Sequence, residues 1–271
     1  MKKILVGFSA IGVALIGASM FAAFEAHVVN VTATIENALS VPVTPITFGT
    51  VFPQEELKKF LGISLSQSFI DERRVDDVEY IIRQKPKCGV TSDNGTVLVG
   101  PTWTGHVVVV GGDTQGYTSY VDCELDRPAT VTSTPNDLDF YLLPSLCEYI
   151  SKHPDGVSTS SITSINDGSL NSFHQPYTIS ATGTIVWNDT LGYLAKSEND
   201  TTDNWTIDLA VPCFGGFCGQ DWEAFVQGVN PNALPASQWA QPIGNEHKVF
   251  GCNLWVEVTG VSEATSTPNV E

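Results

Sequence analysis

The segment Ile46–Phe69 constrains the fold more than any other part of the sequence. Apolar and polar residues alternate at its two ends, Ile46–Phe52 and Ile63–Phe69, and Pro53 lies between them. Side chains of a strand point alternately to opposite faces, so each end predicts a strand with one buried face. Proline lacks an N–H, so a central strand is not expected to continue through Pro53. Two strands are not stable alone in water, and the rest of the chain must supply a second layer.

The composition favours a globular all-β protein. The chain has 271 residues, of which 42% are hydrophobic and only 16% charged, so it can bury a substantial core in one or two domains. Methionine is scarce, and threonine, serine, valine and glycine are frequent, as is typical of short strands joined by turns. The formal charge of −17 repels nucleic acid and anionic membranes. We therefore expect no nucleic-acid partner.

The N-terminus predicts export. Lys2 and Lys3 precede the apolar run Ile4–Ile16, and the small-residue segment Gly17–Ala23 follows it, which is the pattern of a signal peptide and processing region over residues 1–26. We place the cleavage near Ala23, with an uncleaved anchor as the alternative. No other segment approaches the about 20 apolar residues that a membrane span needs. The sequence therefore predicts a secreted or cell-surface protein.

An even set of cysteines agrees with export. The six are Cys88, Cys123, Cys147, Cys213, Cys218 and Cys252. In an oxidising compartment they predict three disulfides, although sequence alone does not choose the pairing. Three lie in each half of the chain, so either one bridge joins the halves or one thiol in each half is free. We pair Cys213 with Cys252 if their strands are antiparallel neighbours.

A zinc site is the alternative for three of these cysteines. Cys213 and Cys218 are spaced like a ligand pair, and Cys252 with His247 would complete a tetrahedral set. Oxidised cysteines are the ordinary state outside the cell, and we therefore favour disulfides.

The segment His27–Glu36 has the most regular alternation in the chain. Its apolar positions are Val29, Val31, Ala33 and Ile35. The Pro-containing linker Asn37–Pro45 separates it from the next expected strand, which gives it reach. It can pair within its own sandwich, or it can add to an open sheet edge of a neighbouring subunit.

Further strands and turns complete the fold prediction. We expect strands at Val78–Lys85, Trp103–Val110, Tyr117–Leu125, Asp139–Leu143, Tyr177–Trp187, Leu191–Ala195, Trp205–Val211 and Leu254–Val261, and short helices at Ser145–Lys152 and Asp221–Gln227. Pro86 and Cys88 are expected to end the first of these strands. The fold class is all-β: a two-layer β-sandwich, jelly-roll or immunoglobulin-like, with one or two short helices in loops. It forms one domain over residues 27–262, with a loop-rich insertion at 89–168 and a polar disordered tail at 263–271.

The leader and the strand after it carry a family resemblance. The leader ends in Phe21-Ala22-Ala23-Phe24, and the alternating strand follows directly. This pattern is similar to that of the camelysin/TasA family. The resemblance covers the first ninety residues and implies a secreted matrix protein with a jelly-roll fold, whose N-terminal strand can complement the next subunit of a fibre. The six cysteines and the long insertion depart from the family pattern.

The sequence shows no catalytic motif. Some camelysin relatives are classed as metallopeptidases, but this chain has no His-Glu-x-x-His, and no two of its five histidines are four residues apart. We read His247 as a loop residue. No Gly-x-Ser-x-Gly elbow or phosphate-binding loop is present either. The expectation is that the protein is not an enzyme, and we assign no catalytic residue.

Two further features could bind ligands. Glu198, Asp200 and Asp203 could gather around Ca²⁺, but the loop matches no EF-hand spacing and a solvated turn explains them better. Trp239 lies in a Pro-rich loop and could stack on a sugar, whereas Trp205 and Trp255 belong to alternating strands and are expected in the core. We otherwise expect no cofactor.

Two function classes remain. The first is a secreted or cell-surface structural protein that assembles with itself through its N-terminal strand into an extracellular matrix or fibre. The second is an extracellular module that binds a glycan or the cell wall through loops at the rim of the sandwich. A metallopeptidase is a more distant third reading.

Overall fold

The computed structural model describes residues 33–91, 103–112, 116–123, 139–155 and 168–263. The expected leader, residues 27–32 of the expected N-terminal strand and residues 264–271 of the tail lie outside these ranges. The chain divides into two units, Met1–Ile35 and Glu36–Glu271. The sandwich described below belongs entirely to the second unit.

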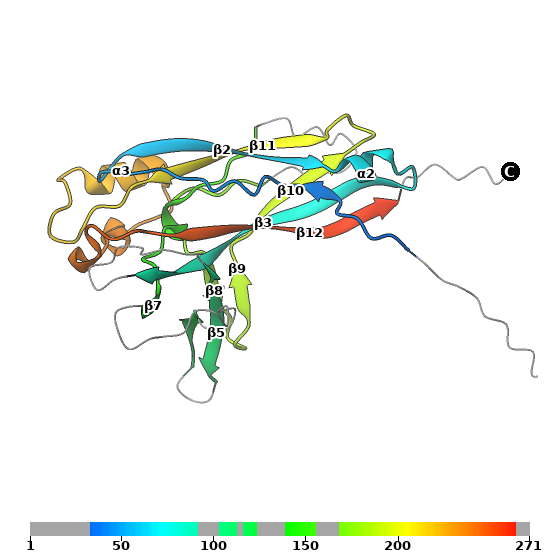
Figure 1. The fold of residues 1–271 in the computed structure, drawn as a ribbon. Helices are drawn as coiled ribbons and strands as arrows, with labels where there is room; N and C mark the ends of the chain where they lie inside the picture. The colour runs from blue at the N-terminus through cyan, green and yellow to red at the C-terminus, as the bar shows by residue number, and fades with distance from the viewer. Residues whose placement is uncertain (1–32, 92–102, 113–115, 124–138, 156–167, 264–271) are drawn as a thin grey trace, which may run out of the picture. The chain divides into compact units, whose positions relative to one another are not determined.

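Two antiparallel layers make up the sandwich (Figure 1). One layer has the strand order β1 (Leu39–Ser40), β2 (Glu56–Leu65) and β11 (Thr202–Ala210). The other has the order β10 (Thr190–Ala195), β3 (Val75–Thr91) and β12 (Cys252–Glu263). The predicted all-β sandwich with short helices is therefore confirmed.

Alternation of side chains along β3 builds one wall of the core. Val78, Tyr80, Ile82 and Gln84 are fully buried, whereas the residues between them are only half-buried. This is the face that the sequence predicted for Val78, Tyr80 and Ile82. The opposite wall comes from the same period-2 pattern in β2 (Leu61, Ile63, Leu65) and β11 (Trp205, Ile207, Leu209), and all of these belong to one hydrophobic cluster.

The two long sides of the sandwich differ. On one side β10 leads directly into β11, and reciprocal backbone hydrogen bonds between Ala195 and Asp200 (2.8 and 3.0 Å) close the corner between the layers. On the other side the edges are β1 and β12, which do not pair with each other. The two layers are therefore joined along one long side and open along a seam on the other.

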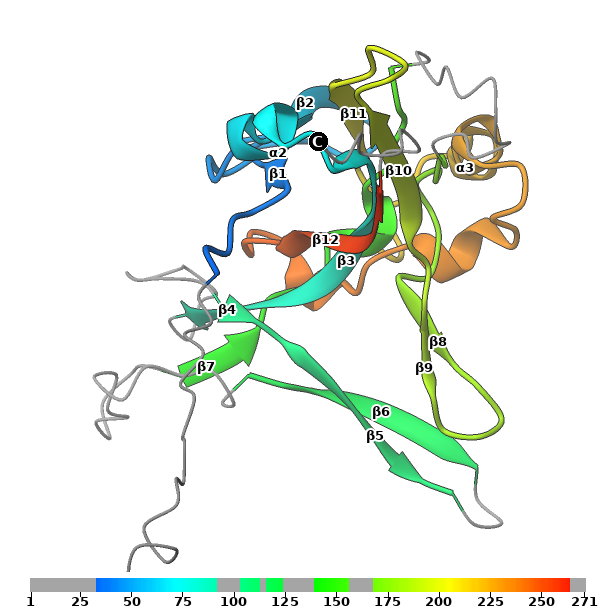
Figure 2. The same cartoon turned by 90° about the vertical axis from the view of Figure 1, so that its right-hand side faces the viewer.

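Further strands lie beyond the sandwich (Figure 2). The end of β3 pairs with β4 (Trp103–Thr104) and β7 (Asp139–Leu142), and two hairpins follow: β5 (His106–Gly111) with β6 (Tyr117–Asp122), and β8 (Tyr177–Ile179) with β9 (Ile185–Trp187). The hairpins meet where the Ser119 and Tyr177 hydroxyls lie 3.3 Å apart. The predicted hairpin of Trp103–Val110 with Tyr117–Leu125 is confirmed for β5 and β6, whereas Trp103–Thr104 pair with β3 instead and residues 124–125 lie outside the described ranges.

The helical elements are short. Among the described residues they comprise α2 (Gln67–Asp71), α3 (Trp222–Val229) and three short 3-10 helices, η1 (Cys147–Tyr149), η2 (Ala236–Trp239) and η3 (Ile243–Asn245). The helix predicted near Asp221–Gln227 is present as α3, but it ends after Val229 rather than at Gly228.

Several expected strands are wrong in detail. Residues 46–52 form no strand, and β2 instead begins at Glu56. Phe69 lies in a helix because the Ser66 side chain caps α2 by accepting a hydrogen bond from the Phe69 N–H (3.1 Å). The segment Tyr177–Trp187 is a hairpin rather than one strand, since Gly183 has a φ of +79° and turns the chain.

Two further boundaries were also predicted wrongly. β3 continues through Pro86, because the proline lies where the pairing with β12 ends and the pairing with β4 begins: Pro86 is opposite Cys252, and Lys87 is opposite Thr104. The helix expected at Ser145–Lys152 is reduced to η1. Beyond it, Ile150 and His153 bridge to β11, so tertiary pairing displaces helical bonds.

All six cysteines are in disulfides: Cys88–Cys123, Cys147–Cys252 and Cys213–Cys218. The suggested Cys213–Cys252 pair is wrong, because Cys213 follows β11 in one layer while Cys252 begins β12 in the other. One bridge joins the two halves of the chain, as the count of three cysteines per half allowed. Three disulfides are typical of an oxidising compartment.

The Cys147–Cys252 bridge is expected to contribute most to stability. It closes a sequence separation of 105 residues, against 5 for Cys213–Cys218. Chain entropy then gives about 4.8 kcal/mol for the long loop and about 2 kcal/mol for the short one. Replacing both cysteines of each bridge with alanine and measuring urea unfolding tests this order. Equal losses from the two pairs of substitutions would contradict it.

A buried lysine predicts a pH dependence. The Lys152 side chain is fully buried, its Nζ donates to the Ile82 carbonyl (3.1 Å), and burial lowers its pKa to about 7. The unfolded chain keeps this proton up to its ordinary value of 10.5, so the unfolding free energy should rise from pH 7 towards about 9.5, by up to ~1.4 kcal/mol per unit. Lys152→Met should remove this slope and stabilise the protein at pH 7. Exposed Lys58→Met is the control, and a slope unchanged in Lys152→Met would refute the assignment.

Candidate functional site

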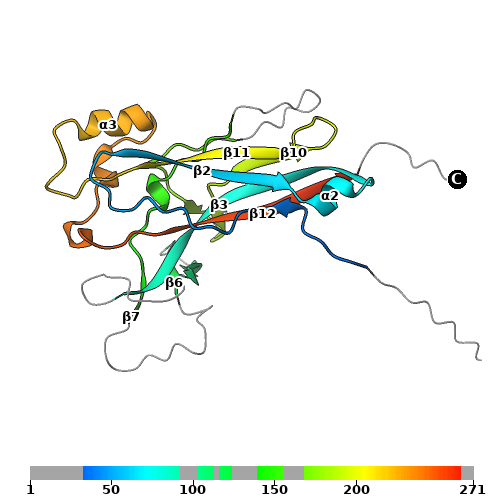
Figure 3. The ribbon, with the colours of Figure 1, turned by 45° about the horizontal axis from the view of Figure 1, so that its top comes forward.

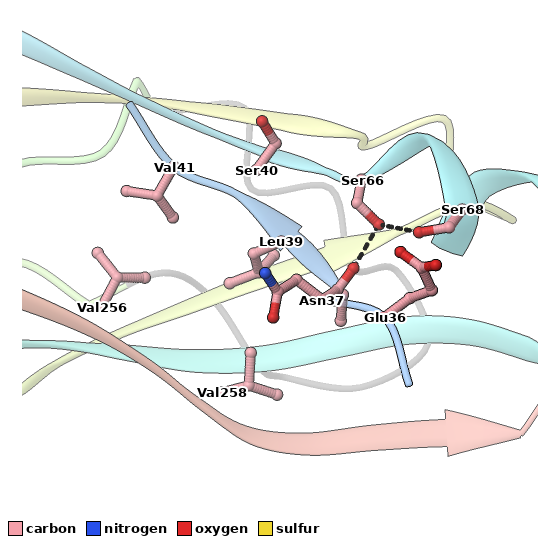
Figure 4. A pocket seen from close by; sticks show the side chains of 10 residues that line it. Glu36, Asn37, Leu39, Ser40, Val41, Ser66, Ser68, Val256 and Val258 are labelled. Atoms are coloured by element: carbon pink, nitrogen blue, oxygen red, sulfur yellow. Dashed lines mark hydrogen bonds between the residues drawn. The ribbon is translucent and has the colours of Figure 1, made fainter. Parts of the chain in front are cut away.

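A groove lies along the open seam of the sandwich (Figure 4). Its volume is about 560 Å³. The lining residues come from the chain around β1, from the start of α2 and from β12: Glu36, Asn37, Ala38, Leu39, Ser40, Val41, Ser66, Ser68, Val256 and Val258. The groove therefore lies between the unpaired edges of the two layers.

The sequence explains why this side stays open. β1 pairs through only Leu39 with Leu65 and Ser40 with Ser64, so it covers little of the long edge of β2. β12 pairs with β3 on one side, and its other side has no strand partner among the described residues. Pro42 and Pro45 follow β1, and because neither can donate a backbone hydrogen bond, β1 cannot extend as a regular strand.

The chain after β1 lies over the seam without joining either sheet. Figures 1 and 3 show it running between β2 and β12. We call residues Val41–Val51 the strap. Val41, Ile46, Phe48 and Val51 are half-buried against the core, yet no backbone hydrogen bond joins the strap to another described residue. Apolar side chains hold it in place, and its backbone groups are available to another partner.

The walls of the groove are apolar and its rim is polar. Val256 and Val258 point from β12 toward β1, where Leu39 and Val41 lie opposite (Figure 4). At the rim the Ser66 hydroxyl donates to the Asn37 carbonyl (2.6 Å) and lies 3.1 Å from the Ser68 hydroxyl. Glu36 supplies the one charged side chain of the lining. This arrangement suits an extended peptide with alternating apolar side chains.

The structure describes only part of the expected assembly strand. Val29 and Val31 lie outside the described residues, whereas Ala33 and Ile35 are described and form no strand. The Ile35 side chain is 94% exposed. The expected linker Asn37–Pro45 contains β1, a strand that the alternation of Leu39 and Val41 with polar neighbours could have indicated.

The expected calcium ligands do not form a cluster. Asp203 is buried and accepts a short hydrogen bond from the Tyr80 hydroxyl, which in turn accepts one from Trp205 Nε1 (2.7 Å). Asp200 is buried at the β10–β11 corner. In the part of the chain that the structure describes, no three His, Cys, Asp or Glu side chains gather as a metal site would require.

The tryptophans are distributed differently from the sequence prediction. Trp239 is 4% exposed, donates through Nε1 to the Ala233 carbonyl (2.6 Å) and packs near Phe173, so it offers no surface for sugar stacking. Trp205 is buried in the core as predicted. Trp255 was expected there too, but it is 42% exposed on the outer face of β12, with the Lys85 ammonium 3.3 Å from its ring centroid.

The alternative zinc set is not assembled. Cys213 is bonded to Cys218, and Cys252 is bonded to Cys147. His247 is an exposed loop residue with a positive φ, as predicted, and its closest ionic neighbour is Glu246 at 3.9 Å. The disulfides therefore occupy the thiols that zinc would need.

Comparison with known proteins adds no relative. No protein-family model, curated protein or solved structure matches this chain. Among the described residues, no helix is long and apolar enough to cross a membrane.

Oxidation of all six cysteines gives a direct test. When the purified chain is unfolded without reductant and exposed to a thiol reagent, we expect no labelling, because each sulfur is already bonded. Mass mapping of the non-reduced peptides should recover the three pairs given above. Stoichiometric labelling of Cys213, Cys218 and Cys252 would instead support the zinc alternative.

Proposed function

We propose that the protein is a secreted or cell-surface structural protein that assembles with itself when the strand 27–36 of one copy enters the seam groove of another. The observation that carries the proposal is the seam: in the part of the chain that the structure describes, two unpaired sheet edges lie on either side of a groove with apolar walls and a polar rim. An exposed edge of this kind is a template for an added strand.

The chemistry of the two parts matches. In an extended strand, Val29, Val31, Ala33 and Ile35 share one face, which would pack against Val256, Val258 and Leu39. The polar residues between them would face solvent. Backbone hydrogen bonds to the free edges would supply affinity, and the apolar side chains would set the register.

The topology restricts how the strand can enter. Each strand in the order β1, β2, β11, β10, β3 and β12 runs opposite to the one before it, so β1 and β12 run in opposite directions. One strand between them must be antiparallel to one edge and parallel to the other. A donor that pairs with β12 in the stronger antiparallel mode is therefore parallel to β1.

Removing the donor strand tests the proposal. Deletion of residues 27–36 should leave a folded monomer, because the described core draws on none of these residues. Full-length chain should form high-molecular-mass species that sedimentation velocity and electron microscopy detect. A full-length chain that stays monomeric at high concentration, or a deletion variant that still polymerises, would refute strand insertion.

A matched pair of variants separates strand insertion from a general effect of charge. Val31→Asp with Ile35→Asp places two charges on the face directed at the groove and should abolish assembly. Thr32→Asp with Thr34→Asp adds the same charge to the opposite face and should retain it. Val258→Asp on the acceptor wall should also block assembly. A chain with Val258→Asp should still donate its own strand to a wild-type copy but should accept none. Mixing it with wild-type chain should therefore stop growing assemblies.

A further inference from the structure

The strap, residues Val41–Val51, has the pattern of a strand but forms none. Ile46 and Phe48 are half-buried against the core, whereas Thr47 and Gly49, which alternate with them, are exposed. This period-2 pattern is the reason that the sequence predicted a strand from Ile46 onwards. The strap instead lies between β2 and β12 without a backbone hydrogen bond to another described residue (Figure 3). It is therefore a strand-like segment that lies unpaired beside two sheet edges.

Two prolines prevent the strap from pairing regularly. The strap leads from β1 to the start of β2 and so runs antiparallel to β12 (Figure 3). A donor strand that pairs with β12 in the antiparallel mode takes the same direction. Pro42 and Pro45 are three residues apart, and N–H groups at odd spacing along an extended strand point to opposite edges. Each edge of the strap therefore lacks one donor, and neither edge can complete a regular ladder.

The donor strand needs more of β12 than the groove exposes. Residues 27–36 span about 33 Å when extended, whereas Val256 and Val258 are the residues of β12 that line the groove. β12 has 12 residues, so a donor that pairs along its full length covers Leu254 wherever it begins. Leu254 is half-buried and packs against the same core cluster as Ile46 and Phe48 of the strap. A fully paired donor therefore enters the part of the seam in which the strap lies.

We propose that the strap competes with the donor strand: it fills the seam of the single chain and must leave before residues 27–36 of another copy pair along β12. This competition rests on the proposed strand insertion and adds the step that controls it. Release of the strap breaks no backbone hydrogen bond, since the strap makes none to the described residues. It loses the apolar contacts of Ile46, Phe48 and Val51, which the apolar face of the donor then replaces. The fraction of chains whose strap is released sets the apparent affinity for the donor.

Loosening the strap tests this step. Phe48→Ser removes one of the side chains that hold the strap, so the full-length chain should assemble about fivefold faster, as followed by light scattering. Val43→Ser is the matched control: it makes a similar change in the strap, but Val43 is 98% exposed, and the rate should not change. Adding Val31→Asp and Ile35→Asp to Phe48→Ser should abolish assembly again, which separates strand insertion from aggregation of a damaged fold.

Restoring the missing donors should act in the opposite direction. Pro42→Thr with Pro45→Thr returns one N–H to each edge of the strap, so the strap can pair with the sheet edges beside it. The restored hydrogen bonds should slow assembly about tenfold. Hydrogen exchange is measured on full-length chain that carries Val31→Asp and Ile35→Asp and therefore stays monomeric. The strap amides should exchange fast when both prolines are present and slowly in the proline variant.

The outcomes separate the competition from strand insertion. If wild-type chain assembles and neither Phe48→Ser nor the proline variant changes the rate, competition by the strap is overturned while strand insertion stands. Slower assembly of Phe48→Ser would also overturn it, because the strap would then assist insertion. Fast exchange of the strap amides in the proline variant would overturn the pairing of the strap with the sheet edges. If wild-type chain does not assemble at all, strand insertion fails and the competition fails with it.

Discussion

The pairing of β3 is the constraint on which the rest of the structure depends. This 17-residue strand is antiparallel to β10 and β12 along its first part and to β4 and β7 along its last. Its buried face supplies Val78, Tyr80 and Ile82 to the core, and Gln84 continues that face. The Gln84 amide donates to the carbonyls of Cys147 (3.1 Å) and Ile150 (3.0 Å). One strand thereby fixes a layer, a wall of the core and the segment that joins β11.

The segment of residues 150–153 connects the core to a smaller cavity of about 220 Å³ beside β11. Residues 150–153 are anchored to β3 through Gln84 and Lys152, and to β11 through Ile150 and His153. Ser151 lies between these anchors and His153 is one of them, so both line the cavity from fixed positions. Burying the Lys152 ammonium lowers the stability of the fold, because the ammonium loses its hydration. The same Nζ nevertheless pairs with the Ile82 carbonyl inside β3, so it ties the segment to the core.

Period-2 alternation made most of the sandwich predictable. Val78–Ile82 and Trp205–Leu209 alternate cleanly, and both were assigned to the correct strands and faces. Alternation also misled: it continues through Ala181-Thr182-Gly183, where the chain turns at Gly183, so one strand was expected instead of β8 and β9. The disulfide pairing depends on which strands become neighbours across long separations, and local pattern carries no such information.

Neither the seam groove nor the smaller cavity beside β11 could be predicted from local sequence patterns. Neither strand that borders the seam has an unusual sequence. β1 covers only two residues, and β12 has the pattern of an ordinary last strand. What makes a groove is that both edges remain unpaired, which is a property of topology. The smaller cavity beside β11 draws Glu56, Ser151, Ser172 and Asp208 from four separate segments of the chain. No spacing rule in the sequence joins them, and only the fold brings them together.

Net charge also bears on how copies of the chain can associate. At −17, two copies repel each other at long range, and this repulsion falls off within about 8 Å at physiological ionic strength. Side-by-side pairing of exposed edges would bring whole acidic surfaces together. An inserted strand would instead present one narrow, uncharged segment, residues 28–35, to a groove whose walls are apolar. An open seam on a strongly acidic sandwich therefore favours strand insertion over lateral edge pairing, and the charge itself acts against unspecific aggregation through the same edges.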